Sequence, residues 1–205
     1  MKDLLIATTN PAKFAEYGVV LRGFGLELIS LRDAGITAEA PEGAPTFAEN
    51  ARMKARFYFD IAGIPALADD GGLEVDALGG APGVRSHRWL GEDSDDRTLA
   101  EEVIRRMAGV EPARRTARLR AAAALIYKED ATVREAIAEA ALEGIVADRC
   151  YPEIRAGFPY RSVLYLPERE CFLAEVDEED AAVSLSQRRI AVGKLASDLR
   201  RIAAG

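Results

Sequence analysis

An apolar run that leads directly into a helix start opens the chain and constrains its first two elements. Residues 3–9 contain Leu-Leu-Ile-Ala, a composition typical of a buried strand. The run ends in the sequence TTNP, in which Asn10 is a favourable N-cap and Pro11 suits the first helical position. We therefore predict a strand over residues 3–9 and a helix from residue 11 to about residue 22.

Strand-like and helix-like segments alternate along the rest of the chain. The strand-like runs are residues 26–30, 65–68, 73–78, 117–127 and 132–142. The helix-like segments are residues 46–61, 94–107 and 186–203. A Pro/Gly-rich loop at residues 40–45 precedes Thr46, which is a capping candidate. Residues 132–142 are ambiguous, because Ala and Glu favour a helix whereas their place between strand-like segments favours an antiparallel strand. We predict a strand there.

Composition narrows the class of protein. The chain has 205 residues, 49% of them hydrophobic, and no linker or internal repeat, so we predict a single domain over residues 1–205, with or without two lobes. The net charge is -7 with scattered Lys and Arg, which argues against a nucleic-acid partner. The longest apolar runs fall short of the roughly 20 residues that a membrane span needs, so no membrane partner is expected.

The start of the chain and its cysteines suggest a compartment. No signal-peptide pattern follows Met1, which makes the cytoplasm the expected location. Two cysteines without metal-ligand spacing and a single histidine, His87, make zinc chemistry and a Ser-His-Asp triad improbable.

The junction of the first strand and the first helix, residues 7–13, is a candidate phosphate site. Free backbone N–H groups and the positive end of the helix dipole attract phosphate, and Lys13 would add a point charge. The alternative is a capped helix without a ligand, which is the commoner use of such a junction.

Two adjacent carboxylates, Asp69 and Asp70, follow a short apolar run and precede two glycines. Because adjacent carboxylates repel each other, a divalent metal is a natural partner, and Mg²⁺ prefers one or two carboxylates together with substrate phosphates. The same sequence is also typical of a turn. In either case we expect these carboxylates at the end of a strand.

Two further segments carry side chains that could bind a ligand. Glu42, Glu49 and Lys54 lie in or near the start of the second helix, where solvated surface charge is the alternative explanation. Phe158 and Tyr160 belong to an aromatic loop that could stack on a base or could fill the edge of the core.

Together these segments resemble the inosine and xanthosine triphosphate pyrophosphatases, which hydrolyse purine nucleoside triphosphates to monophosphate and pyrophosphate. The resemblance covers nearly the whole chain. It rests on TTNPAK at residues 8–13, on TFAENA at residues 46–51 and above all on ADDGGLEVDALGGAPGV at residues 68–84. It implies an α/β fold with a long, twisted mixed sheet, flanking helices and two lobes around a central cleft, usually as a homodimer.

The resemblance also implies roles for individual residues. Asp70 would be the general base and Lys54 a catalytic cation. The cofactor Mg²⁺ would be positioned by Glu42, Asp69 and Asp70. The nucleoside triphosphate would be bound by Thr8, Thr9, Asn10, Lys13, Gly71, Phe158, Tyr160, Arg161, Gln187 and Arg188.

Four positions depart from the family pattern where the nucleotide would be contacted. Gly71 stands where the family has Ser, and Asp180 stands where it has Lys. Gln187 replaces a His beside the retained Arg188. Arg161 replaces an Asp, and since a guanidinium only donates hydrogen bonds, readout of a purine N–H is expected to be lost or inverted.

These departures favour a pyrophosphatase that keeps its hydrolytic residues but has altered base recognition. We expect Arg161→Asp to shift its selectivity toward inosine or xanthosine triphosphate. Two alternatives stay open at this point: a diverged, non-catalytic nucleotide-binding or regulatory protein, and a structural homodimer without a ligand.

Overall fold

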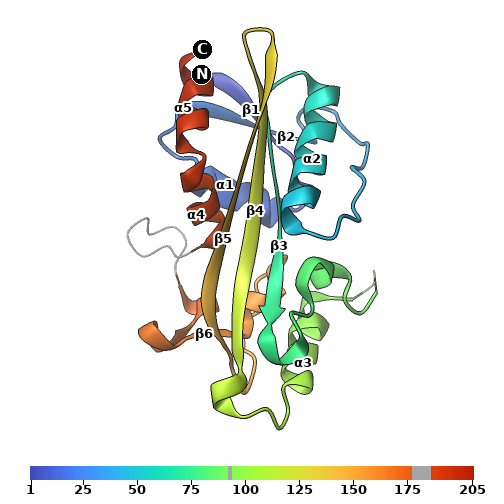
Figure 1. Cartoon of the computed structure of the whole chain (residues 1–205), viewed down its shortest axis with the longest axis vertical. Helices are drawn as coiled ribbons and strands as arrows, with labels where there is room; N and C mark the ends of the chain where they lie inside the picture. Colours follow the sequence, from blue (N-terminus) through green and yellow to red (C-terminus); the bar gives the residue numbers. More distant parts are fainter. Residues whose placement is uncertain (92–93, 177–185) are drawn as a thin grey trace. The chain divides into compact units, whose positions relative to one another are not determined.

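Helices and strands alternate along the chain as expected of an α/β protein. A computed structural model describes residues 1–91, 94–176 and 186–205 (Figure 1). Its α-helices are α1 (Pro11–Val20), α2 (Phe47–Ala62), α3 (Asp96–Arg106), α4 (Gln187–Lys194) and α5 (Ala196–Ala204). Its strands are β1 (Lys2–Ile6), β2 (Leu26–Ser30), β3 (Ala66–Val75), β4 (Thr116–Glu129), β5 (Thr132–Val146), β6 (Leu164–Leu166) and β7 (Cys171–Phe172).

The strands form a mixed sheet. In the described part of the chain, seven strands pair in the order β2-β1-β3-β4-β5-β6-β7. Strand β1 is parallel to β2 and to β3, whereas β6 is antiparallel to β5 and to β7. The predicted α/β fold with a mixed sheet and flanking helices is therefore confirmed.

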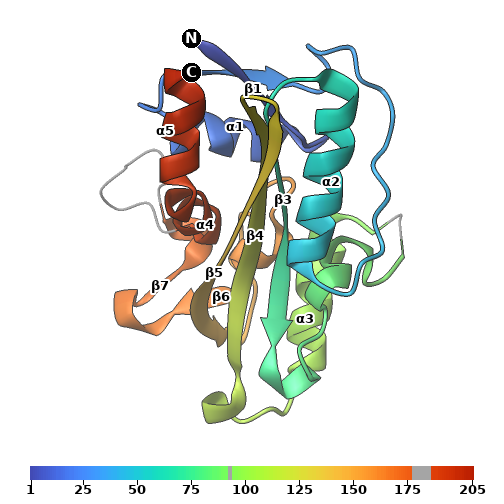
Figure 2. The same cartoon turned by 45° about the horizontal axis from the view of Figure 1, so that its top comes forward.

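Two compact units share these elements. The first unit comprises residues 1–70, 121–140 and 188–205, and the second unit comprises residues 71–120 and 141–187. Each unit has a hydrophobic core of its own. Figures 1 and 2 show α2 and α5 on opposite sides of the strands of the first unit.

The helix N-caps predicted from the sequence, Asn10 and Thr46, are confirmed. The Asn10 side chain accepts hydrogen bonds from the backbone N–H groups of Ala12, at 2.9 Å, and Lys13, at 3.3 Å, and it caps α1. Thr46 caps α2 in the same way by accepting from the Glu49 N–H at 3.2 Å. The ambiguous segment at residues 132–142 lies in β5, because sheet pairing outweighs the helix propensity of its Ala and Glu residues.

Several predicted boundaries are wrong. The strand expected over residues 73–78 ends at Val75, and Asp76–Leu78 form a short 3-10 helix. Strand β1 ends at Ile6, where the chain turns away with a hydrogen bond from the Thr8 N–H to the Ile6 carbonyl. The predicted helix at residues 186–203 is two helices, α4 and α5, with Leu195 between them. The Leu195 side chain is buried in the core of the first unit, and Gly193 two residues earlier weakens the helix at that point.

Among the described residues, no helix has the length and apolarity that crossing a membrane requires.

Close packing at Gly72 in β3 gives a stability prediction. A Cβ at this position would lie 2.0 Å from Ser86 Oγ and 2.7 Å from the Gly83 carbonyl oxygen. Ser86 Oγ cannot easily move, because it donates to that carbonyl and accepts from the Leu73 N–H. We expect Gly72→Ala to lower the free energy of unfolding by about 1–3 kcal/mol in urea titrations.

Gly18 in α1 provides the matched control for this substitution. Outside its own helix, no atom of the described residues lies within 4 Å of a Cβ built there. We expect Gly18→Ala to leave stability unchanged or to raise it by up to about 1 kcal/mol, because alanine favours a helix more than glycine does. Similar losses in both variants would contradict the steric explanation for Gly72.

Candidate active site

Charged side chains from five segments meet in the first unit. They come from α1, from the loop before α2, from α2 itself, from β3 and from α4. The residues are Lys13, Glu16, Glu42, Lys54, Asp69, Asp70 and Arg188. All but Glu16 belong to the predicted site, so the structure brings the hydrolytic set together within one unit.

The two adjacent carboxylates lie inside a strand and not at its end, which corrects the prediction. Strand β3 runs without a break from Ala66 to Val75 through Asp69 and Asp70. Sheet pairing therefore outweighs the turn preference of the Asp-Asp-Gly-Gly sequence. Neighbouring residues of a strand point to opposite faces, so the two carboxylates contact different partners.

Asp69 is buried in a network of opposite charges. Its Oδ2 atom accepts from Arg188 Nε at 3.0 Å and lies 3.1 Å from Lys13 Nζ. Arg188 also forms an ion pair with Glu16. All four side chains are less than 9% exposed as residues, and two positive charges balance two negative charges.

These partners fix the charge of Asp69. Burial by itself would raise the pKa of Asp69, but attraction to Arg188 and Lys13 holds that pKa well below its ordinary value. Its second oxygen, Oδ1, is buried and makes no hydrogen bond of normal geometry to the described residues. The Tyr17 hydroxyl is also buried without a hydrogen bond of normal geometry to the described residues. Burial together with the nearby Asp69 charge raises the pKa of Tyr17 well above its ordinary value.

Asp70 is in a different environment. Its carboxylate lies 3.5 Å from Lys54 Nζ, and that ammonium is also 3.2 Å from Glu42 Oε1. Burial raises the pKa of Asp70, and attraction to Lys54 opposes this shift without cancelling it. For Lys54, burial lowers the pKa, but the surrounding carboxylates outweigh it and raise the pKa overall.

The surroundings of the two carboxylates therefore shift their pKa values in opposite directions. Asp69 is kept ionised and paired, whereas Asp70 has a raised pKa, which moves it toward the range of a general base. A pair of neighbouring acids whose pKa values are moved apart is a common sign of divided roles in catalysis. The geometry fits a proton acceptor at Asp70 and an electrostatic support at Asp69.

The carboxylates can also be compared with the needs of a divalent metal. No group of three His, Cys, Asp or Glu side chains in the described ranges is arranged to coordinate an ion. However, Glu42 and Asp70 both contact the Lys54 ammonium, and Asp69 Oδ1 makes no hydrogen bond of normal geometry within the described part of the chain. Because Mg²⁺ needs only one or two carboxylates in addition to substrate phosphates, these residues fit it, and the full ligand set stays a prediction.

Asn10 caps the start of α1, in accord with the capped-helix alternative. The Asn10 carboxamide oxygen is used for the cap, and the Asn10 backbone N–H donates to Thr8 Oγ1 at 3.2 Å. Lys13 is buried beside Asp69. Phosphate binding by Thr8, Thr9, Asn10 and Lys13 stays a prediction.

The aromatic loop belongs to the second unit, where its residues have structural partners. Tyr160 is 4% exposed, packs in the core of that unit and donates to the Ser86 carbonyl at 2.5 Å, in accord with the core-filling alternative. Arg155 lies over the Phe158 ring at 5.3 Å. Arg161 is buried and donates to the carbonyls of Leu173, at 3.0 Å, and Val176, at 3.4 Å.

The remaining described residues that depart from the family pattern lie in different elements. Gly71 follows Asp70 within β3. Gln187 is the first residue of α4 and is buried, and its Oε1 atom has no hydrogen-bond partner among the residues described. Asp180 lies outside the described residues. The substrate roles of Gly71, Phe158, Tyr160, Arg161 and Gln187 stay predictions.

Sequence reasoning gave no role to Glu16. It lies three residues after Lys13, so both project from one face of α1, and its ion pair with Arg188 joins α1 to α4. The signal in the sequence was an acidic residue between Phe14 and Tyr17 on an apolar helix face, since buried charges are paired.

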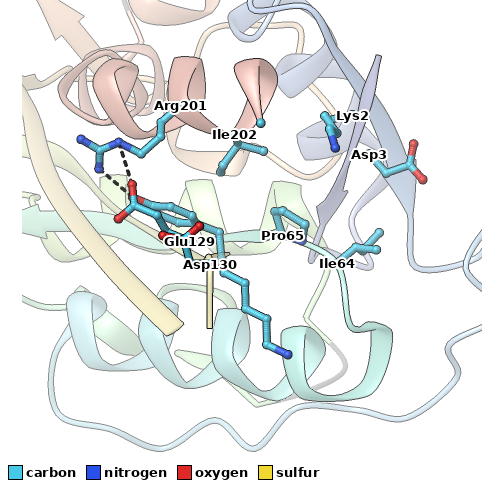
Figure 3. A pocket seen from close by; sticks show the side chains of 11 residues that line it. Lys2, Asp3, Ile64, Pro65, Glu129, Asp130, Arg201 and Ile202 are labelled. Carbon is cyan, nitrogen blue, oxygen red and sulfur yellow. Dashed lines mark hydrogen bonds and ion pairs between the residues drawn. The ribbon is translucent and has the colours of Figure 1, made fainter. Parts of the chain in front are cut away.

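A cavity of about 510 Å³ in the first unit lies apart from these residues (Figure 3). The start of β1 and the ends of β4 and α5 line it, and Arg201 pairs with Glu129 at 3.1 Å on its wall. None of the predicted site residues lines this cavity, so it has no part in the predicted site.

Comparisons with known proteins identify relatives of this chain. The model of the Ham1 family matches residues 4–198. The dITP/XTP pyrophosphatase of Geobacillus kaustophilus is 38% identical over 205 residues, covering 100% of this chain and 98% of that protein. The dITP/XTP pyrophosphatase of Bacillus subtilis is 36% identical over 195 residues, covering 95% and 96%. A solved structure of a HAM1 protein from Coxiella burnetii has a TM-score of 0.81 at 31% identity, covering 98% of this chain and 100% of that one.

The family and the enzyme class predicted from the sequence motifs, a pyrophosphatase, are both confirmed by these relatives. The match spans almost the whole chain and includes every residue of the charged cluster. The chain therefore belongs to the Ham1 family.

Proposed function

We propose that this protein is a Mg²⁺-dependent pyrophosphatase of nucleoside triphosphates, with non-standard purine nucleotides such as ITP, dITP and XTP as its substrate class. The observation that carries this proposal is the arrangement of two adjacent carboxylates in one strand, with Asp69 paired to Lys13 and Arg188 and Asp70 beside Lys54. The dITP/XTP pyrophosphatases among its relatives support the choice of substrate.

The reaction needs a water molecule to attack the α-phosphorus of the nucleotide. Asp70 would orient that water and accept its proton, while the bond from the α-phosphorus to the bridging oxygen breaks and pyrophosphate leaves. Lys13 and Lys54 would bind the phosphate oxygens on which negative charge increases. Asp69 would keep Lys13 and Arg188 in place.

A divalent metal would complete this site. When bound, it neutralises phosphate charge that the lysines alone leave uncompensated. Glu42 and Asp70, which already face the same ammonium, would be its protein ligands, with Asp69 close to them in sequence. Altered base recognition, a homodimer and a cytoplasmic location remain part of this proposal as predictions from the sequence.

The test is pyrophosphate release from a panel of ITP, dITP, XTP and the common ribo- and deoxyribonucleoside triphosphates. We expect kcat/KM to be highest for a non-standard purine, and we expect loss of release when EDTA removes the metal. Separate assays for pyrophosphate and orthophosphate distinguish attack at the α-phosphorus from attack at the γ-phosphorus. Nucleotide binding without release from any member of the panel would instead support the non-catalytic alternative.

A further inference from the structure

Three polar side chains follow one another along one face of α2. Asn50, Lys54 and Tyr58 are spaced by four residues, which places them above one another on a helix. Asn50 and Tyr58 are each 4% exposed. Only Lys54 belongs to the predicted catalytic set, so the other two require an explanation.

Asn50 and Tyr58 both bind the segment that carries Glu42. Asn50 Oδ1 accepts from the backbone N–H groups of Gly43, at 3.2 Å, and Ala44, at 2.9 Å. Asn50 Nδ2 donates to the Ala44 carbonyl at 3.2 Å, and the same side chain also hydrogen-bonds the Asp70 carboxylate, so Asn50 joins the Glu42 segment to Asp70. At the other end of the segment, the Ala40 N–H donates to the Tyr58 hydroxyl at 3.3 Å.

Glu42 lies between these two attachment points. The segment of residues 40–44 belongs to no helix or strand, and neither Pro41 within it nor Pro45 after it has a backbone N–H to donate. The Glu42 side chain is 39% exposed whereas that of Lys54 is 12% exposed, so solvent weakens the ion pair from the Glu42 side. The pair with Lys54 therefore does not by itself explain why Glu42 stays at this place.

We propose that Asn50 and Tyr58 are positioning residues that fix Glu42 beside Lys54 and Asp70 before any ligand binds. The link to a divalent metal rests on the proposed function, since Glu42 and Asp70 are its proposed ligands. Groups that orient metal ligands typically change metal affinity by about 10–100-fold when they are removed. The 16-residue helix α2 supplies the rigid support for this arrangement.

The first measurement uses amide hydrogen exchange and needs no activity. In Asn50→Ala, the Gly43 and Ala44 amides lose their acceptor, and we expect their exchange to become at least about tenfold faster. In Tyr58→Phe, only the Ala40 amide should lose protection. Thr46→Ala is the matched control, because it removes the cap of α2 without touching residues 40–44. It should leave the exchange of Gly43 and Ala44 unchanged.

The second measurement is calorimetric titration of the protein with Mn²⁺ alone, followed by the dependence of pyrophosphate release on Mg²⁺. We expect Asn50→Ala to weaken Mn²⁺ binding by about tenfold and to raise the Mg²⁺ concentration needed for half-maximal rate. The rate at saturating metal should change less than that concentration does. Thr46→Ala should match the wild type in both titrations.

The two possible failures can be told apart. Unchanged exchange of Gly43 and Ala44, or faster exchange with unchanged Mn²⁺ affinity, would overturn the positioning role. A wild-type protein that releases no pyrophosphate would contradict the proposed function, yet the exchange and Mn²⁺ results would still decide the role of Asn50. If Asn50→Ala does not fold, Tyr58→Phe serves as the deciding variant, with protection at Ala40 and Mn²⁺ affinity as its readouts.

Discussion

Asp70→Asn is expected to lower kcat/KM for pyrophosphate release by about 10²–10⁴-fold, the contribution of a positioned general base. The substitution keeps the shape of the side chain and removes its ability to accept a proton. Because Asp70 is also a proposed metal ligand, the comparison is made at saturating Mg²⁺, where Lys13 and Lys54 still bind the substrate and most of the loss should be in kcat. The measurement is steady-state kinetics on the best substrate of the panel.

The stability of Asp70→Asn distinguishes loss of the general base from damage to the fold. Folding raises the pKa of Asp70, mainly through burial, so the ionised form is less favourable in the folded than in the unfolded chain. Removing that charge should therefore leave the melting temperature unchanged or higher. Asp60→Asn on the exposed face of α2 is the control, since Asp60 pairs only with Arg56 among the described residues. Equal rates for both variants and the wild type would exclude Asp70 as the base.

Arg188→Met should give the largest loss of stability, about 3–5 kcal/mol in the free energy of unfolding. The substitution leaves Asp69 and Glu16 as buried carboxylates without their shared cation. Removing one partner of a buried ion pair costs more than the pair itself contributes, because the remaining charge is desolvated and uncompensated. Urea unfolding followed by circular dichroism measures this loss.

A second substitution tests the cause. If the loss arises from an uncompensated charge, Glu16→Gln combined with Arg188→Met should cost less than the sum of the two single changes. Arg201→Met is the surface control, because Arg201 is exposed and pairs with Glu129 at 3.1 Å, and about 1 kcal/mol or less is expected. Additive losses at positions 16 and 188 would contradict the proposed network.

The parts of the fold that the sequence predicts are those set by neighbouring residues. Asn10 and Thr46 are caps because their side chains bond to backbone groups two or three residues away. Asp69 and Asp70 were placed at a strand end because local propensity favours a turn, whereas pairing with distant strands continues β3 through them. The contact between Arg188 and Asp69 joins residues 119 positions apart, so no local pattern could predict it.

Residues that match the family motif lie together, whereas their catalytic roles stay predictions. Lys13 contacts Asp69, and Lys54 contacts Asp70. At Arg161 the chain departs from the motif, and the guanidinium donates to two backbone carbonyls of the second unit. A change in selectivity of Arg161→Asp therefore has to be interpreted together with its stability, because the substitution also leaves those carbonyls without a donor.

The alternation of Asp69 and Asp70 along β3 makes the length of this strand as important as its composition. A strand repeats its side-chain direction every second residue, so an insertion or deletion of one residue before Asp69 would exchange the faces of the two carboxylates. Asp69 would then point to the face of Lys54, and Asp70 to the face of Arg188. Substitutions that keep the alternation can preserve the contacts of the two carboxylates. A shift of the strand register by one residue cannot.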